Sequence, residues 1–370
     1  MPARSPLWYI GSCSTRVMDC LSDSFHRPIS YLRISVTDRC NLRCLYCVPP
    51  QGVQHMSPHQ VLRYEEIVRI VQAAQGLGIT KVRVTGGEPL VRSGIVDFIR
   101  MLAAVEGIQD IAITTNGILL KKYAGELRQA GLKRVNVSLD TLRPDRFRHI
   151  TRGGRLGDVL EGLAAAEAAG LSPIKINVVA MRGFNDDEVE DFGRMTLERD
   201  WHVRFIELMP MGQGNEERLE DLEAMADTPR CVSPDFQTLL QQGHIQDGFL
   251  SIAHVRHLLS SLGPLEPSEV MGNGPARYYR LPRARGTLGF ISPISEYFCS
   301  NCNRLRLTAD GRLRPCLLAE HEIDLRATLR LGASQEELQA LIRQAISAKP
   351  ERHLIDQNKA PRDRMVQIGG

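Results

Sequence analysis

The sequence has no long apolar run and almost no imbalance of charge. No stretch of its 370 residues approaches the ~20 apolar residues of a membrane span, and the N-terminus lacks the apolar core of a secretory signal. The net charge is only +3, which gives no reason to expect nucleic-acid binding. With 43% hydrophobic and 24% charged residues, the composition indicates a cytoplasmic globular protein with one large domain and an appendage.

A fourth cysteine is missing beside each of two cysteine groups. These groups are C-x₃-C-x₂-C at Cys40, Cys44 and Cys47, and C-x₂-C-x₁₃-C at Cys299, Cys302 and Cys316. The total of nine is odd, and without an export signal it favours metal ligands in a reducing compartment over disulfides. The other three are Cys13, Cys20 and Cys231, and the sequence assigns them no role.

Three thiols suit an iron–sulfur cube better than zinc. A structural zinc site normally closes with four ligands, whereas a cube held by three thiolates leaves one iron open to bind a small molecule. From the spacing alone, zinc and a ferredoxin-like site stay open as alternatives, with Cys231 as a candidate fourth ligand of the second group.

Strand-like and helix-like segments alternate from about residue 30. Six β-branched runs are expected to be strands: Leu32–Val36, Lys81–Thr85, Ile111–Thr114, Val135–Ser138, Ile174–Val179 and Val203–Leu208. Apolar residues with helical spacing lie between them, for example from Ile67 to Leu77, from Ile95 to Leu102 and from Leu160 to Ala169. This alternation predicts a parallel α/β sheet, in which chemistry is placed at the C-terminal ends of the strands.

Polar and basic residues mark these strands as the wall of a site. Thr85-Gly-Gly-Glu-Pro89 follows the second strand, and its glycines would let the backbone approach a ligand. Arg304 and Arg306 alternate beside the second cysteine group, which places two guanidinium groups on one face for phosphate binding. Four more cations lie on strands, at Arg33, Arg83, Lys175 and Arg204. They indicate a shared anion such as a triphosphate, with separate salt bridges to Glu88 and Glu207 as the alternative.

Three parts of the chain are expected. Residues 1–27 form an N-terminal extension, and residues 28–250 form the α/β unit with a polar insertion at about 215–249. Residues 251–370 form a C-terminal domain that begins with a short helix, carries the second cysteine group and ends in Gly369-Gly370.

The first cysteine run and Gly86-Gly-Glu-Pro89 resemble the motifs of the radical S-adenosylmethionine (SAM) enzymes. Together with Asn136-Val-Ser-Leu-Asp140, Phe205-Ile-Glu-Leu-Met209, the second trio, Arg304-Leu-Arg306 and the terminal Gly-Gly, they resemble the GTP 3′,8-cyclase family, also called molybdenum cofactor biosynthesis protein A. The resemblance covers roughly residues 28–370. It implies an incomplete (β/α)₆ TIM-like barrel whose open side is closed by a C-terminal α+β segment.

The resemblance also implies two 4Fe-4S clusters, one on each cysteine trio. The first would cleave SAM, held by Tyr46, Gly87, Ser138 and Met209. The second would hold the guanine of GTP, with further contacts from Arg33, Arg83, Thr114, Lys175, Arg304 and Arg306. A 5′-deoxyadenosyl radical would remove the ribose 3′ hydrogen, and the carbon radical would add to guanine carbon 8.

The implied partners are GTP, a reductase or flavodoxin-type electron donor, and cyclic pyranopterin monophosphate synthase as recipient of the product. A homodimer stays open, and neither nucleic acid nor a membrane is expected. Two alternative functions remain: a radical SAM enzyme that modifies peptides, and a zinc-containing module that binds nucleic acid.

Overall fold

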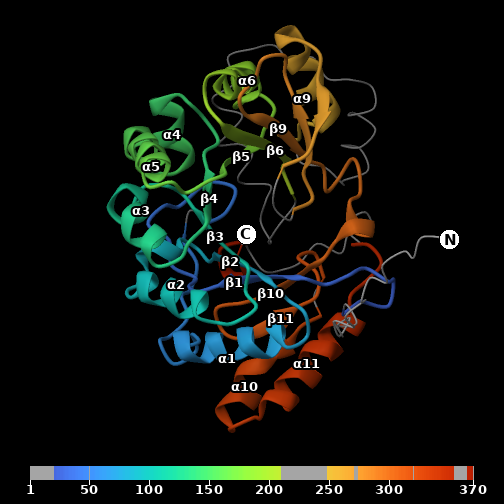
Figure 1. Cartoon of the computed structure of the whole chain (residues 1–370). Helices are drawn as coiled ribbons and strands as arrows, with labels where there is room; N and C mark the ends of the chain where they lie inside the picture. The colour runs from blue at the N-terminus through green and yellow to red at the C-terminus, as the bar shows by residue number, and fades with distance from the viewer. Residues whose placement is uncertain are drawn as a thin grey trace, which may run out of the picture.

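The computed structural model describes residues 21–49, 51–209, 248–270, 274–319, 321–353 and 365–369. Its centre is a twelve-stranded sheet with the order β12-β11-β10-β1-β2-β3-β4-β5-β6-β9-β8-β7. From β10 through β1–β6 to β9 the strands run parallel, and the outer strands on both sides are antiparallel. In Figure 1 the sheet curves around the middle of the molecule as an incomplete barrel.

The strand bounds agree closely with the six expected strands. The barrel strands are β1 (Tyr31–Ser35), β2 (Lys81–Thr85), β3 (Asp110–Thr115), β4 (Arg134–Ser138), β5 (Ile174–Ala180) and β6 (Trp201–Glu207). The C-terminal strands are β7 (Glu266–Ser268), β8 (Arg277–Arg280), β9 (Thr287–Ile291), β10 (Arg304–Leu307), β11 (Arg312–Arg314) and β12 (Ile323–Asp324). Parallel strands are buried on both faces, which explains their β-branched, mostly apolar sequences.

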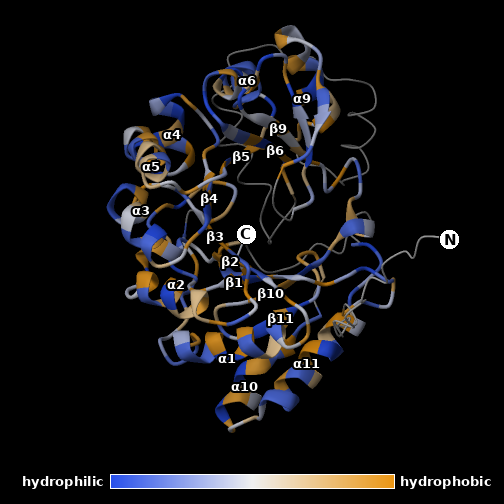
Figure 2. Ribbon diagram, viewed as in Figure 1, coloured by the Kyte–Doolittle hydropathy of each residue, from blue (hydrophilic) through white to orange (hydrophobic). Residues whose placement is uncertain are grey.

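Helices cover the outer face of this sheet (Figure 1). They are α1 (Tyr64–Gln75), α2 (Ile95–Ala103), α3 (Leu120–Gln129), α4 (Pro144–Ile150), α5 (Leu156–Ala168), α6 (Val189–Glu198), α9 (Ile252–Leu259), α10 (Leu325–Arg330) and α11 (Gln335–Ser347). The last described helix, α12 (Met365–Ile368), lies inside the barrel instead. Figure 2 shows α1, α10 and α11 with both hydrophobic and hydrophilic residues, as expected for helices with one buried side. None of the described helices has the length and apolar character that crossing a membrane requires.

The C-terminal segment flanks the barrel on both sides. β10 pairs with β1 and β9 pairs with β6, so the prediction of a partial α/β barrel is confirmed. Within the described ranges no ladder of hydrogen bonds joins the two ends of the sheet. The expected closure is made by side chains instead. Met209 and Ile294, from the β6–β9 side, pack in one apolar cluster with residues that follow β11 and with α12. The expected insertion at 215–249 lies almost wholly outside the described residues.

Candidate active site

One large cavity opens inside the barrel, and the predicted site residues meet there. The predicted residues of the first cluster and SAM that line it are Cys40, Cys44, Tyr46, Cys47, Gly87, Ser138 and Met209. The predicted GTP residues that line it are Arg33, Arg83, Thr114, Arg304 and Arg306, and the second trio of Cys299, Cys302 and Cys316 lines it as well. Lys175 is the exception: it is buried and is not among the residues that line the cavity. Arg204, which the sequence also singled out, lines the cavity with them.

The first cysteine trio lies on the loop that follows β1. Within this loop the Cys47 amide donates to the Cys44 carbonyl at 2.9 Å, and the Leu42 amide donates to the Cys40 sulfur at 3.4 Å. Burial raises the pKa of the Cys40 thiol to about 11, and burial together with Cys47 raises the pKa of Cys44 well above its usual range. Cys40 and Cys44 are therefore poorly suited to act as free thiolates, and they would become anionic when a metal displaces their protons.

The two glycines after β2 are required by the backbone of this loop. A Cβ atom on Gly86 would lie 2.6 Å from the Thr37 carbonyl oxygen, and one on Gly87 would lie 2.4 Å from the Arg39 carbonyl oxygen. The Gly87 amide already donates to the Thr37 carbonyl at 2.7 Å. A ligand contact at Gly87 would therefore have to use its carbonyl oxygen. Glu88 is fully occupied as well, because it accepts from Leu90, Thr115 and Asn116.

Tyr46 is held by a carboxylate that the sequence did not assign. Its hydroxyl donates to Asp140 Oδ2 at 2.7 Å, while Oδ1 of the same carboxylate accepts from the Val179 amide. Burial raises the pKa of Asp140 to about 6. The Asn-Val-Ser-Leu-Asp stretch thus places both Ser138 and Asp140 on the cavity wall, with Asp140 at the hydroxyl of Tyr46.

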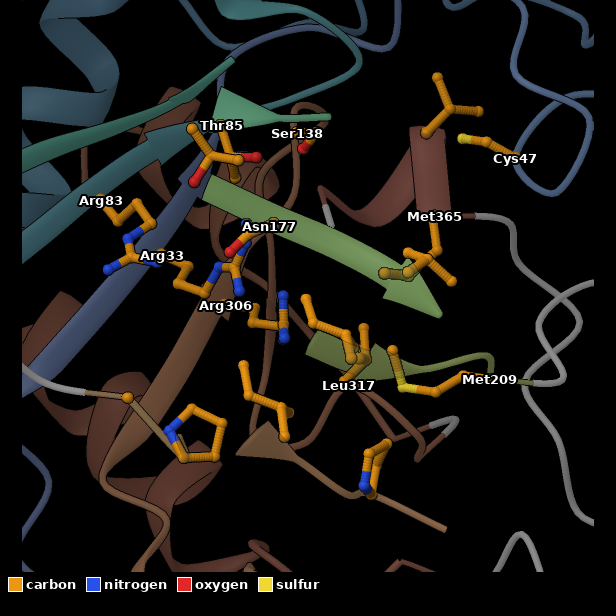
Figure 3. Close-up of a pocket in the computed structure, with 18 of the residues that line it drawn as sticks. Arg33, Cys47, Arg83, Thr85, Ser138, Asn177, Met209, Arg306, Leu317 and Met365 are labelled. Carbon is orange, nitrogen blue, oxygen red and sulfur yellow. The ribbon is translucent and has the colours of Figure 1, made fainter. Parts of the chain in front are cut away.

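A row of arginines crosses three adjacent strands. Arg306 on β10 is in register with Arg33 on β1, which is in register with Arg83 on β2. Figure 3 shows these three guanidinium groups gathered on one side of the cavity, with Cys47, Met209 and Met365 on the other. Burial lowers the pKa of Arg306 to about 9 and that of Arg83 to about 10. Concentrated positive charge that is costly to bury fits a polyanionic ligand.

The structure does not support the alternative that the strand cations form separate salt bridges with Glu88 and Glu207. Glu88 bonds to the loop after β3 as described above, and Glu207 accepts from the amides of Ile252, Ile294 and Ser295. Neither carboxylate is paired with the strand cations. Among the described residues, Arg83 Nε, Arg204 Nε and the Tyr31 hydroxyl are buried without a hydrogen-bond partner. A ligand rich in oxygen acceptors would satisfy them.

The second cysteine trio also lines the cavity: Cys299 and Cys302 lie between β9 and β10, and Cys316 follows β11. The pKa of the Cys302 thiol is shifted in the opposite direction from those of Cys40 and Cys44. Burial alone would raise the pKa of this thiol, but the nearby cations of Arg304 and Lys349 bring it down to about 6. Burial raises the pKa of Cys299. Cys302 is thus held as a thiolate at neutral pH, ready to bind metal.

Both trios fit iron–sulfur clusters better than single zinc ions. All six described cysteines are free thiols on the wall of a cavity. Within the described ranges, no three His, Cys, Asp or Glu side chains converge in the way that the ligands of one metal ion do. A zinc ion binds all of its sulfur ligands directly, at Zn–S distances of about 2.3 Å, so its cysteines must converge on one point. In a 4Fe-4S cluster each thiolate binds a different iron, so the sulfur atoms can lie further apart.

The end of the chain enters the same cavity. α12 places Met365 and Val366 on the wall, and the Gly369 carbonyl accepts from Arg306 Nη1 at 2.9 Å. Gly369 has a φ of +77°, and a Cβ atom there would lie 2.8 Å from the Ser35 Cβ atom. Gly370 lies outside the described residues. The tail therefore orients one member of the arginine row.

The barrel, the first trio and the glycine motif define a radical SAM enzyme. The Radical SAM superfamily model matches residues 34–196, and the Molybdenum Cofactor Synthesis C model matches residues 235–355. A crystal structure of Streptococcus suis SuiB bound to S-adenosylmethionine shares the fold, with a TM-score of 0.51 and 14% identity over 85% of this chain and 68% of that chain.

Curated relatives narrow the class to one family. A GTP 3′,8-cyclase from Heliobacterium modesticaldum is 48% identical over 352 residues, which cover 94% of this chain and 99% of the relative. A GTP 3′,8-cyclase from Pelotomaculum thermopropionicum is 48% identical over 351 residues, covering 95% and 100%. The chain belongs to the GTP 3′,8-cyclase family, as the sequence motifs predicted.

Proposed function

We propose that this chain is a radical SAM GTP 3′,8-cyclase, a lyase that converts GTP into (8S)-3′,8-cyclo-7,8-dihydroguanosine 5′-triphosphate. This is the first step of molybdenum cofactor biosynthesis. The observation that carries the proposal is the placement of two cysteine trios and a row of buried arginines on the wall of one cavity. Membership of the cyclase family supports GTP as the substrate.

The residues divide between two ligands. Cys40, Cys44 and Cys47 hold the first 4Fe-4S cluster, beside which Tyr46, the Gly87 carbonyl, Ser138 and Met209 hold SAM. Cys299, Cys302 and Cys316 hold the second cluster, which faces the guanine. When bound, the first cluster and SAM supply the radical chemistry that removes the ribose 3′ hydrogen before carbon 8 is attacked.

The protein contributes charge, position and exclusion of water. Arg33, Arg83 and Arg306 neutralise the triphosphate, with Arg304, Thr114 and Lys175 as further GTP residues. Because the guanidinium groups are fixed on strands, they bind without reorganising. The apolar cluster of Met209, Ile294 and α12 covers the open side of the barrel and shields the reacting carbons from solvent.

The partners follow from this chemistry. An electron must reach the first cluster, and a reductase or flavodoxin-type protein is the proposed donor. The product passes to cyclic pyranopterin monophosphate synthase. Oxygen-sensitive clusters on reduced thiols fit the cytoplasm. Sedimentation of the reconstituted protein would distinguish a monomer from a homodimer.

The test is anaerobic reconstitution with iron and sulfide, followed by product analysis with SAM, a reductant and GTP. About eight irons per chain and a yield of 5′-deoxyadenosine that rises with GTP are expected. Cys299→Ala should keep SAM cleavage and lose cyclisation, whereas the matched variant Cys40→Ala should lose both. Bound zinc without SAM cleavage, or SAM cleavage indifferent to GTP in the unaltered protein, would refute the proposal.

A further inference from the structure

A short segment after α11 contacts every stretch of chain that carries the second cysteine trio. This anchor segment comprises residues 349–353, far along the chain from Cys299. Lys349 is only 3% exposed although it is charged. Its ammonium donates to the Arg304 carbonyl at 2.9 Å and to the Pro315 carbonyl at 2.5 Å. Lys349 therefore ties together the segments that follow Cys302 and precede Cys316.

The Lys349 ammonium also touches the trio directly. It forms a side-chain hydrogen bond with Cys302 and lies close enough to Cys316 to interact with it electrostatically. A buried ammonium is costly unless charge and hydrogen bonds compensate it, and here carbonyls and sulfur do so from three sides.

Arg27 makes the corresponding link to the remaining cysteine. Arg27 is 5% exposed, and Asp23 Oδ2 holds its Nε at 2.6 Å. Nη1 donates to the carbonyls of Cys299 and Glu351, both at 2.8 Å, and Nη2 donates to the Pro350 carbonyl at 2.6 Å. One guanidinium therefore joins the turn that carries Cys299 to the anchor segment.

His353, the last residue of the anchor segment, makes the remaining contacts. The His353 amide hydrogen-bonds to Cys299, and the His353 ring bonds through Nε2 to the Pro293 carbonyl at 2.8 Å. All three cysteines are thus connected to one segment of five residues. Two of these links end on the cysteine side chains themselves, and the others end on backbone carbonyls.

We infer that Lys349 and Arg27 are positioning residues of the second cysteine trio, which hold its three segments at the spacing that a cluster needs. The inference rests on the proposed function only in taking this trio as a 4Fe-4S site. Outer partners of metal ligands typically change metal affinity 10–100-fold when they are removed. In addition, the two buried cations offset the negative charge of a thiolate-bound cluster.

The experiment isolates the second trio in the full-length chain. In a Cys40→Ala/Cys44→Ala/Cys47→Ala background, reconstitution should leave about four irons per chain. Lys349→Met and Arg27→Met added to this background should lose iron to a chelator at least ~10-fold faster, with an altered electron paramagnetic resonance spectrum. Lys349→Arg, which keeps the cation, should stay close to the parent.

Arg69→Met is the matched control, because Arg69 also donates from a guanidinium to a carbonyl, that of Ala333 at 2.6 Å, away from both trios. It should retain iron like the parent. Equal retention in Lys349→Met, Arg27→Met and Arg69→Met would overturn the inference.

The chain with both trios intact separates positioning from a general loss of folding. There, Lys349→Met should lose iron from the second trio only, and should still cleave SAM. Loss of iron from both trios would mean a general structural role and would overturn the inference. If the triple-alanine parent itself held no iron, the cluster assignment would be refuted, and with it the proposed function.

Discussion

At the scale of single residues, Lys175 is the predicted GTP residue that does not line the cavity, and its pKa is strongly shifted. Lys175 lies over the Tyr278 ring at 5.2 Å and is buried beside Arg83, Arg134 and Arg204. Burial, followed by these like charges, lowers the pKa of Lys175 to about 6. In the free protein this lysine is therefore mostly neutral at pH 8.

Binding of GTP should return a proton to Lys175. A triphosphate favours the charged form of the amine, which moves its pKa upward through pH 8. The phosphates are already ionised at this pH, so uptake approaching one proton per GTP is expected. Calorimetry of the reconstituted protein in two buffers with different ionisation enthalpies measures it. Lys175→Met should lower the uptake by close to one proton, and equal uptake in both proteins would contradict the assignment.

A second residue-scale prediction concerns the tail. Gly369→Ala places a methyl group against Ser35 and forces an L-residue into a φ of +77°. The Gly369 carbonyl should then leave Arg306. Cyclisation is expected to fall at least ~10-fold while SAM cleavage continues, because only the substrate side of the cavity is disturbed. Gly332→Ala is the control, since Gly332 also has a positive φ, of +90°, but nothing lies within 4 Å of its Cβ position. Normal cyclisation by Gly369→Ala would show that the tail does not orient Arg306.

The sequence singled out most of the residues that the structure gathers around one cavity, but not the residues that support them. Cysteines, a glycine pair at a strand end and arginines on apolar strands are unusual in those places, so they can be recognised. Arg27 and Lys349 could not be recognised, because most of their hydrogen bonds go to backbone carbonyls, which every residue possesses. Lys175 was predicted as a GTP residue; it does not line the cavity, and its role stays a prediction.

At the scale of elements, one carboxylate fastens the C-terminal segment to the barrel. Glu207 ends β6, is completely buried, and accepts from the amides that begin α9 and the turn after β9. The Ser295 hydroxyl donates to it as well. α9 was expected as a short helix, and the structure confirms it, but the link to Glu207 has no sequence signal.

Glu207→Gln should weaken this junction. An amide has one acceptor oxygen in place of two, and its NH₂ group would face donors. A loss of about 2 kcal/mol in the free energy of unfolding is expected, in line with hydrogen bonds to charged groups. Hydrogen exchange should accelerate around residues 292–296 more than in β1–β3. The exposed pair of Glu161 and Lys121 provides the control, because Glu161→Gln should leave the free energy of unfolding close to that of the unaltered protein. Uniform exchange in Glu207→Gln would contradict a local junction.

At the scale of the whole molecule, the C-terminal third is part of the barrel sheet. The sequence suggested a separate domain from residue 251, because its pattern changes there. Pairing of β10 with β1 and of β9 with β6 could not be predicted, since strand partners far apart in sequence share no local pattern. We propose that the boundary near residue 250 divides regions of sequence, not units that fold independently.

A chain that ends at residue 209 tests this proposal. It would keep β1–β6 and the first trio but expose both edges of the sheet, which are ready templates for pairing with other chains. We expect it to aggregate when it is purified, and sedimentation would measure this. Coexpression with residues 248–370 should restore part of the native form. A monomeric fragment with cooperative unfolding would show that the boundary is a folding boundary after all.

The pairing of β1 with β10 also has a consequence for synthesis on the ribosome. Between Ser35 and Arg304 the numbering advances by 269 positions, all of which must be translated before β1 gains its second neighbour. At ~5–20 residues per second, the edge of β1 stays open for roughly 10 to 60 seconds. The cysteines of the first trio emerge early in that interval, into a nascent chain that has no cavity yet. Iron delivered during translation would find the first cysteine trio without the C-terminal segment that completes the cavity. The metal centres are therefore expected to be installed after the chain is released.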